Sequence, residues 1–344
     1  MMERRLFQAL CRLSLFLVFL CVCMLSLWND RVYPAYAQQN NFIRWVDFDV
    51  PAEAMQAALE QDISTYGSQN HLSWISLLAF LAARYGGDWN LYRPDHLTNL
   101  CEKIRSGETL ESISAGMKGF DYYQEAYQAV LGGFVGVWQR QLPDKVTGIP
   151  SRTESYGLKA FSPIAEGYGY SHYDDFGNSR SYGYRRKHLG NDLIGAVGTP
   201  VVAVESGIVE QAGWNQYGGW RIGIRSFDGK RYYYYAHLRK DHPFAWEIKP
   251  GDLVRGGDVI GYLGMTGYST TENVNGMSVP HLHFGMQLIF DPSQKEGEAE
   301  IWIDVYQLVR LLSANRATVC RDPDTGEMVR KYQAYDEHFA GYLD

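Results

Sequence analysis

The chain has 344 residues, of which 46% are apolar and 14% aromatic, and its formal net charge is −7. This length leaves room for two domains, and the apolar content excludes a largely disordered chain. The acidic balance argues against nucleic acid as the main partner, because neutralising phosphate groups requires a basic surface.

Residues 1–37 are expected to be a signal peptide or a signal-anchor. Arg4, Arg5 and Arg12 precede a mostly apolar run of sixteen residues, 13–28. The apolar region of a signal peptide has about 7–15 residues and a membrane span about 20, so the run lies between the two classes. The basic residues predict that the chain beyond residue 30 lies outside the cytoplasm, in the cell envelope or secreted. We favour an anchor, which would bind the membrane, over cleavage after the motif at 35–37.

Residues 38–141 are expected to form a helical domain, to which the sequence assigns no role. The segment 73–85 is apolar nearly all round and is followed by two glycines, so we expect it to be the central, buried helix of a small bundle. His71 and His96 are isolated in this region and are interpreted as structural or solvent-exposed. The predicted helices are 51–66, 73–85, 94–105, 109–116 and 121–138.

Residues 142–155 contain two prolines and a glycine and are expected to be a linker. The composition then shifts to glycine and tyrosine. Tyrosine offers a flat apolar ring with a polar tip, so this stretch either lines a peptide groove or forms a packed loop, and the sequence does not favour one over the other.

From residue 200 onward, apolar residues alternate with polar ones between turn signals, as in strands. Asp228-Gly229 is a hairpin signal, which places 231–238 beside 220–227. Tyr233, Tyr235 and His237 then share one strand face. If His237 faces a cleft, Tyr235 and Tyr233 would line a substrate groove; the alternative is that they belong to the core. The predicted strands are 201–204, 207–212, 220–227, 231–238, 259–263 and 279–289, followed by a helix at 300–314 and a tail at 315–344.

Three histidine motifs suggest a metal site. They are His188-Leu-Gly-Asn-Asp192, Tyr-Ala-His237-Leu and Pro-His281-Leu-His283-Phe. A catalytic zinc ion takes three protein ligands and leaves its fourth position to water. His188 and Asp192 would supply one nitrogen and one carboxylate. His281 and His283 are two apart on a strand and face the same side, which suits one ligand and one catalytic base.

These motifs resemble the lysostaphin-type (LytM-like) zinc endopeptidases, which cut peptidoglycan cross-links. The resemblance covers 161–289 and includes the framework segments 198–209, 235–238, 249–261 and 266–270. It implies that His188, Asp192 and His283 bind one zinc ion per chain. It also implies that His237 and His281 are the unliganded pair that activates the water and stabilises the oxyanion, with peptidoglycan peptides as the substrate.

The resemblance also implies the fold. We expect an α+β chain in which 156–314 form an all-antiparallel β catalytic domain with the open two-sheet lysostaphin-like fold. The sequence departs from the family at Gly285, where an acidic residue commonly follows His-x-His-Phe, and in a long insertion between Thr266 and His281. His172, Asp174 and Asp175 have no counterpart in the family and are interpreted as loop.

Two other functions use the same residues. A catalytically weak or inactive relative could serve as an envelope scaffold that binds cell-wall peptide or a protein partner through the same groove, but all five site positions are filled here. A non-haem iron oxygenase uses two histidines and one carboxylate, but its first pair is normally His-x-Asp, whereas the spacing here is His-x-x-x-Asp. Among hydrolases, we favour cleavage of stem-peptide cross-links over glycine bridges. No protein partner is indicated.

The cysteines do not form a framework. Three of the five lie in the N-terminal apolar run, and the others are Cys101 and Cys320. Two cysteines so far apart lack the spacing of a cysteine zinc site. We expect two separate thiols; a bridge in an exported protein is the alternative that stays open.

Overall fold

The computed structural model describes residues 42–144, 147–335 and 339. The chain divides into two compact units, 1–45 and 46–344, and the helices and strands below belong to the second. The signal peptide or anchor predicted at 1–37 lies outside the described residues. Within the described ranges, no helix has both the length and the apolarity that crossing a membrane requires.

The predicted helices 51–66, 73–85, 94–105 and 109–116 are confirmed to within two residues at each end. Helix α3 is the buried one: ten of its twelve residues are buried, and it ends at Gly86, whose φ of 63° lies in the left-handed region. Helix α4 begins with Pro94, which has no backbone N–H to leave unpaired there. The five α-helices of this part are α2 (Ala52–Thr65), α3 (Trp74–Tyr85), α4 (Pro94–Arg105), α5 (Leu110–Ser114) and α6 (Phe120–Leu131).

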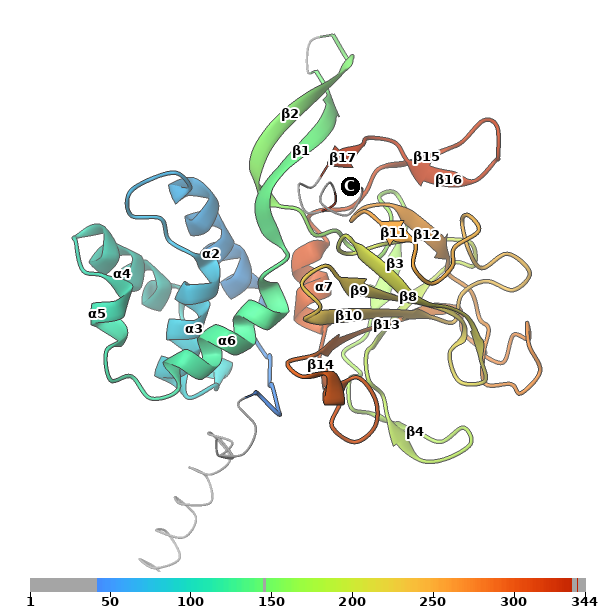
Figure 1. Ribbon diagram of the computed structural model, residues 1–344, viewed down its shortest axis with the longest axis horizontal. Helices are drawn as coiled ribbons and strands as arrows, with labels where there is room; N and C mark the ends of the chain where they lie inside the picture. Colours follow the sequence, from blue (N-terminus) through green and yellow to red (C-terminus); the bar gives the residue numbers. More distant parts are fainter. Residues whose placement is uncertain (1–41, 145–146, 336–338, 340–344) are drawn as a thin grey trace, which may run out of the picture. The chain divides into compact units, whose positions relative to one another are not determined.

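Two predictions at the end of the helical region were wrong. The helix predicted at 121–138 ends at Leu131, because two glycines follow it and the next residues are β-branched and aromatic. The linker predicted at 142–155 belongs to a long hairpin, in which β1 (Val135–Pro143) pairs antiparallel with β2 (Pro150–Leu158), as Figure 1 shows. The prolines and the glycine that suggested a linker lie at or next to the turn of that hairpin.

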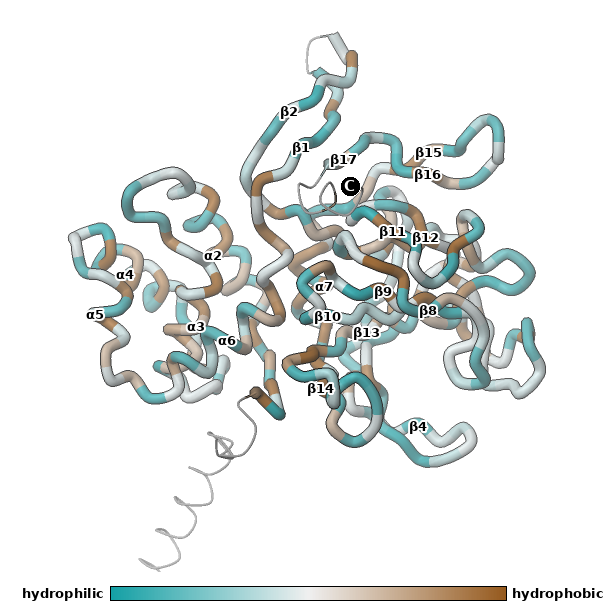
Figure 2. The backbone as a smooth tube through the Cα atoms, viewed as in Figure 1, coloured by the Kyte–Doolittle hydropathy of each residue, from teal (hydrophilic) through white to brown (hydrophobic). Residues whose placement is uncertain are grey.

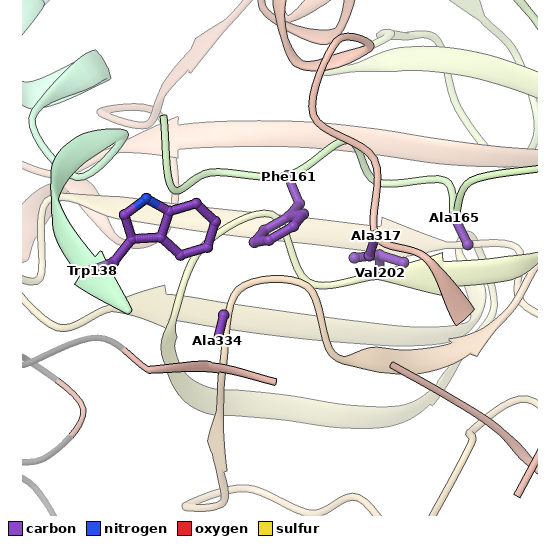
Figure 3. Packing of buried hydrophobic residues seen from close by; sticks show 6 residues of the cluster. All are labelled: Trp138, Phe161, Ala165, Val202, Ala317 and Ala334. Carbon is purple, nitrogen blue, oxygen red and sulfur yellow. The ribbon is translucent and has the colours of Figure 1, made fainter. Parts of the chain in front are cut away.

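The base of the hairpin packs into a hydrophobic cluster. Trp138 of β1 contacts Phe161 edge to face, with 5.7 Å between ring centroids. Ala334 belongs to the same cluster, and β17 (Ala334–Tyr335) pairs with β1. Figure 3 shows these residues packed together. The hairpin is therefore part of the folded unit and does not act as a flexible connection.

A buried carboxylate joins the helices to the hairpin. Asp62 of α2 is 2% exposed, and its Oδ1 accepts a hydrogen bond of 2.6 Å from the Tyr156 hydroxyl of β2. Its Oδ2 accepts from the backbone N–H of Trp74 at the start of α3. His71 Nε2 lies 2.8 Å from Oδ1, and His96 Nδ1 lies 2.7 Å from the Tyr85 hydroxyl, so both isolated histidines have the structural role that was predicted.

The largest sheet of the described chain has eight strands. Its order is β11-β8-β9-β10-β13-β6-β3, with β14 paired to β13, and the pairings between named strands of the described chain are all antiparallel. Figure 2 shows hydrophobic residues in β9 and β14 and hydrophilic ones around β4 (Ser179–Arg180). The strands are β3 (Tyr170–His172), β6 (Asn191–Gly195), β8 (Gly207–Asn215), β9 (Gly219–Ser226), β10 (Arg231–Ala236), β11 (Leu253–Val254), β13 (His281–Leu288) and β14 (Ile301–Ile303).

The strands predicted from alternation are confirmed, with β7 (Pro200–Val202) and β12 (Val259–Tyr262) forming a separate pair. The helix predicted at 300–314 was wrong in its first half: 301–303 are β14, and α7 (Tyr306–Leu312) follows. The tail contains a small hairpin of β15 (Val319–Arg321) and β16 (Met328–Arg330). Cys101 and Cys320 are separate thiols, as expected.

Candidate metal and active site

The two faces of the sheet differ, and the polar face carries a cavity. Strand registers place Ala236 opposite His283 and His283 opposite Asp192, which brings strands β10, β13 and β6 to one place. A cavity of about 650 Å³ lies over this face, a volume typical of ligand sites. All five residues predicted as metal ligands or catalytic residues line it: His188, Asp192, His237, His281 and His283.

Three of these residues converge on one point. His188 Nε2 lies 2.7 Å from His283 Nδ1 and 3.1 Å from Asp192 Oδ1. His283 Nδ1 lies 3.4 Å from the same carboxylate oxygen. Among the described residues, these three form a cluster of the kind that could hold a metal ion.

The chemistry of the cluster fits a zinc ion. Asp192 Oδ1 is buried and has no hydrogen-bond partner among the described residues, so it is an acceptor left unsatisfied by the protein. Ligands about 2.0–2.1 Å from a tetrahedral zinc ion would lie roughly 3.3 Å from one another, close to the spacing here. Two imidazoles and one carboxylate leave a fourth position open, as catalytic zinc sites do.

Charge in the cluster also favours a cation. Burial alone would raise the pKa of Asp192, but the neighbouring imidazoles of His188 and His283 lower it below its ordinary value. Burial lowers the pKa of His188, whereas Asp175 and Asp192 outweigh burial and raise it to about 9. A metal ion would therefore displace a proton from this cluster when it binds.

His237 and His281 are held by backbone carbonyls. His237 Nδ1 donates to the carbonyl oxygen of Thr266 and His281 Nδ1 to that of Val279, both at 2.8 Å. A carbonyl only accepts, so Nδ1 carries the proton and Nε2 is the acceptor in each neutral ring. Burial, with the nearby imidazoles of His281 and His283, lowers the pKa of His237 well below its ordinary value. His281 Nε2 lies 3.8 Å from Asp192 Oδ1, beside the cluster.

The prediction that Tyr233 and Tyr235 line the substrate groove was wrong. Both are at most 1% exposed; the Tyr233 hydroxyl donates to Glu205, and the Tyr235 hydroxyl accepts from Val204 N–H. The residues that line the cavity are those on the other face of β10, Tyr232 and Tyr234. The cause is His237, whose φ of 60° lies in the left-handed region and breaks the alternation of the strand.

Sequence reasoning missed two residues beside the ligands, Asp175 and Arg180. Asp175 Oδ2 lies 3.1 Å from His188 Nδ1, so this carboxylate orients the imidazole from its far side. Arg180 Nη2 contacts Asp175 at 2.7 Å and Asp192 Oδ2 at 3.1 Å. The signal in the sequence is the acidic pair at 174–175, close to His172. His172 packs against Tyr306 instead, with 4.5 Å between ring centroids.

One tyrosine of the tyrosine-rich stretch packs against the cavity wall. Tyr182 stacks on Tyr268, a cavity-lining residue, with ring centroids 4.7 Å apart. Tyr156 stacks instead on Tyr66 of the helical region, at 3.6 Å. The tyrosines of this stretch are absent from the cavity lining, so the packed-loop interpretation holds for Tyr156 and Tyr182, with Tyr182 packing behind a lining residue.

Two glycines are required by close packing at the site. A Cβ on Gly190 would lie 2.5 Å from the Phe284 carbonyl oxygen and 2.9 Å from the His283 ring. A Cβ on Gly285 would lie 2.6 Å from the Leu189 carbonyl oxygen and 3.0 Å from the Trp302 ring. In this chain, a side chain at position 285 would meet the Leu189 carbonyl and the Trp302 ring.

Gly190→Ala is expected to weaken metal retention, because the added methyl group would push the His283 ring away from Asp192. The control is Gly169→Ala, because a Cβ on Gly169 meets no atom within 4 Å and its φ is not positive. Gly177→Ala would be unsuitable, because Gly177 has a positive φ. The measurement is bound zinc per chain after dialysis against a weak chelator. Equal zinc in the two variants would show that the close packing at Gly190 does not position His283.

The model of peptidase family M23 matches residues 186–295, which contain all five site residues. A similar curated protein is the L-Ala–D-Glu endopeptidase of Bacillus subtilis (strain 168). The two are 39% identical over 161 residues, which are 44% of this chain and 48% of the relative. The chain therefore spans about half the length of that relative.

Solved structures are similar as well. The catalytic domain of lysostaphin from Staphylococcus simulans is 37% identical, and the match covers 36% of this chain and 85% of that one, with a TM-score of 0.28. A crystal structure from Ruminococcus gnavus ATCC 29149, named for a glycyl-glycine endopeptidase lytM, covers 83% of this chain and 95% of its own, with a TM-score of 0.50 and 22% identity. The second match shows a shared fold that extends beyond the residues of the family model.

Proposed function

The chain belongs to peptidase family M23, and from this membership we propose that it is a zinc-dependent endopeptidase that hydrolyses peptide cross-links of bacterial peptidoglycan. The observation that carries the proposal is the convergence of His188 and His283 on Oδ1 of Asp192, a buried oxygen with no hydrogen-bond partner in the part of the chain that the structure describes. His237 and His281 line the same cavity with their Nδ1 protons fixed. Because peptidoglycan lies outside the cytoplasmic membrane, the enzyme would act there.

The chemistry divides between a metal ion and the protein. A bound zinc ion would polarise the scissile carbonyl and lower the pKa of a water molecule to about 7. Nε2 of His237 or His281 then accepts the proton of the attacking water. Either ring can donate to the developing oxyanion only when its Nε2 carries a proton, because Nδ1 already donates to the backbone. One imidazole would therefore be the base, and the oxyanion would be stabilised by whichever ring carries a proton on Nε2 as its charge develops.

The cavity supports stem peptides over glycine bridges. Beyond the metal ligands its wall carries side chains of both charges: Arg221, Arg225 and Lys295, with Glu210, Glu296 and Glu300. Trp302, Tyr232 and Tyr234 add aromatic surface between them. Stem peptides carry carboxylate and amine groups that such a wall can bind, whereas a glycine bridge has no side chains. The named relatives differ in the bond they cut, so the groove, rather than the family, is the guide to specificity.

The test is a zymogram with purified bacterial cell walls, with and without a metal chelator. We expect clearing that the chelator abolishes and that added zinc restores. Asp192→Ala is the negative control, since it removes the carboxylate ligand together with its ion pair to Arg180. Absence of clearing by protein that holds one zinc ion would favour the envelope scaffold and overturn the proposal. Mass spectrometry of the released fragments would identify the bond.

A further inference from the structure

Arg180 connects the metal ligand Asp192 to a second carboxylate. Its Nη2 donates to Asp175 Oδ2 at 2.7 Å and to Asp192 Oδ2 at 3.1 Å. Arg180 Nη2 also lies 2.9 Å from His188 Nδ1. His188 Nδ1 in turn lies 3.1 Å from the carbonyl oxygen of Asp175 and 3.1 Å from its Oδ2. The Arg180 side chain is 24% exposed and both carboxylates are 16% exposed, so these ion pairs are largely shielded from water.

The two oxygens of Asp192 have different surroundings. Oδ2 accepts from Arg180, whereas Oδ1 faces His188 Nε2 and His283 Nδ1 and has no hydrogen-bond partner among the described residues. A carboxylate can bind a metal ion through one oxygen or through both. If Oδ2 also became a ligand, it would occupy a position that the reaction needs for water.

We propose that Arg180 is a positioning residue that keeps Asp192 a one-oxygen ligand, with Asp175 anchoring the guanidinium, and so keeps a coordination position open for water. This inference rests on the proposed function. A charge-assisted hydrogen bond from Arg180 to Oδ2 would have to be broken before that oxygen could turn to the metal. The planar guanidinium suits the task because its donors are held in fixed directions.

Substitution of Arg180 is expected to change the geometry of the metal site more than its occupancy. Residues that hold metal ligands in place typically change metal affinity or activity by about 10- to 100-fold when they are substituted. For Arg180 we expect the loss to fall on kcat, because a two-oxygen Asp192 still binds metal. KM should change little, since the rest of the cavity is unaltered.

The experiment uses cobalt(II) in place of zinc, because its visible absorption is strong when four ligands surround it and weakens as the number rises. Arg180→Met is compared with the wild-type chain and with Arg185→Gln, an exposed arginine of the same segment that is absent from the cavity wall. We expect one cobalt ion in all three proteins. Only Arg180→Met should show weaker absorption and a kcat about 10- to 100-fold lower.

Two results would overturn the inference: a cobalt spectrum and kcat for Arg180→Met that match those of Arg185→Gln, or loss of cobalt from a folded Arg180→Met. Should Arg180→Met not fold, Arg180→Lys replaces it. This variant keeps the positive charge on a shorter side chain without the planar fork, and we expect the same weakening of the absorption; an unchanged spectrum would again overturn the inference. Failure of the wild-type chain to bind cobalt would instead count against the proposed function.

Discussion

His283→Ala is expected to abolish zinc retention, whereas His281→Ala is expected to retain zinc and lose turnover. The two histidines are two residues apart on β13 and line the same cavity. Their environments separate them: His283 Nδ1 faces Asp192 Oδ1 at 3.4 Å, while the Nδ1 proton of His281 is bound to the Val279 carbonyl. Loss of a general acid or base typically lowers kcat by about 10²- to 10⁴-fold.

Two measurements on each variant test this difference: zinc content after dialysis and the rate of cell-wall hydrolysis. His242→Ala is the control, because this histidine is 43% exposed and lies beside Glu327, away from the ligands. We expect it to match the wild-type chain in both measurements. If His281→Ala released the zinc and His283→Ala kept it, the roles of the two residues would be reversed.

Arg231→Met is expected to destabilise the fold by about 3–5 kcal/mol, because it leaves the largely buried Glu205 carboxylate without its cationic partner and the Ala129 carbonyl without its donor. Arg231 is 1% exposed, and its guanidinium donates to Glu205 at 2.8 and 3.1 Å and to Asp228 at 2.7 Å. Nη1 donates to the carbonyl oxygen of Ala129 in α6, also at 2.7 Å. The residue therefore joins the helical region to the catalytic sheet, and its loss should weaken both.

Chemical denaturation gives the free energy of unfolding of this variant. A double variant, Arg231→Met with Glu205→Leu, should recover part of the loss, because it also removes the charge that Arg231 neutralised, although it leaves the Tyr233 hydroxyl without its acceptor. If the free energy of unfolding of Arg231→Met were within about 1 kcal/mol of the wild-type value, the buried network would contribute little, since removing one member of a buried ion pair normally costs more.

Most helices and strands could be predicted because their signals lie within a few residues of each element. Gly86 follows the end of α3 and Pro94 begins α4. The linker prediction failed because Pro143 and Pro150 mark a hairpin turn as readily as a flexible connection. What distinguishes the two is the pairing of β1 with β2, which depends on residues outside the turn.

In the site, too, local signals could be predicted from the sequence and contacts between distant residues could not. The ligand types and their spacing were visible in the sequence, and the structure brings them together. The groove tyrosines were assigned to the wrong face because the backbone of His237 departs from the strand, and no residue type reveals that in advance. Asp175 and Arg180 were missed because their contacts with Asp192 join residues 17 and 12 positions apart in the chain, which no local pattern reveals.

The most direct test of the account is X-ray absorption at the zinc edge of the purified, zinc-loaded chain. We expect one zinc ion with two imidazole nitrogens and two oxygen ligands, one from Asp192 and one from water, at about 2.0–2.2 Å. The imidazole signal should fall to one ring in any His188 or His283 variant that still holds zinc. A zinc ion surrounded by three or four imidazoles, or a chain that binds none, would contradict the assignment of His188, Asp192 and His283 as its ligands.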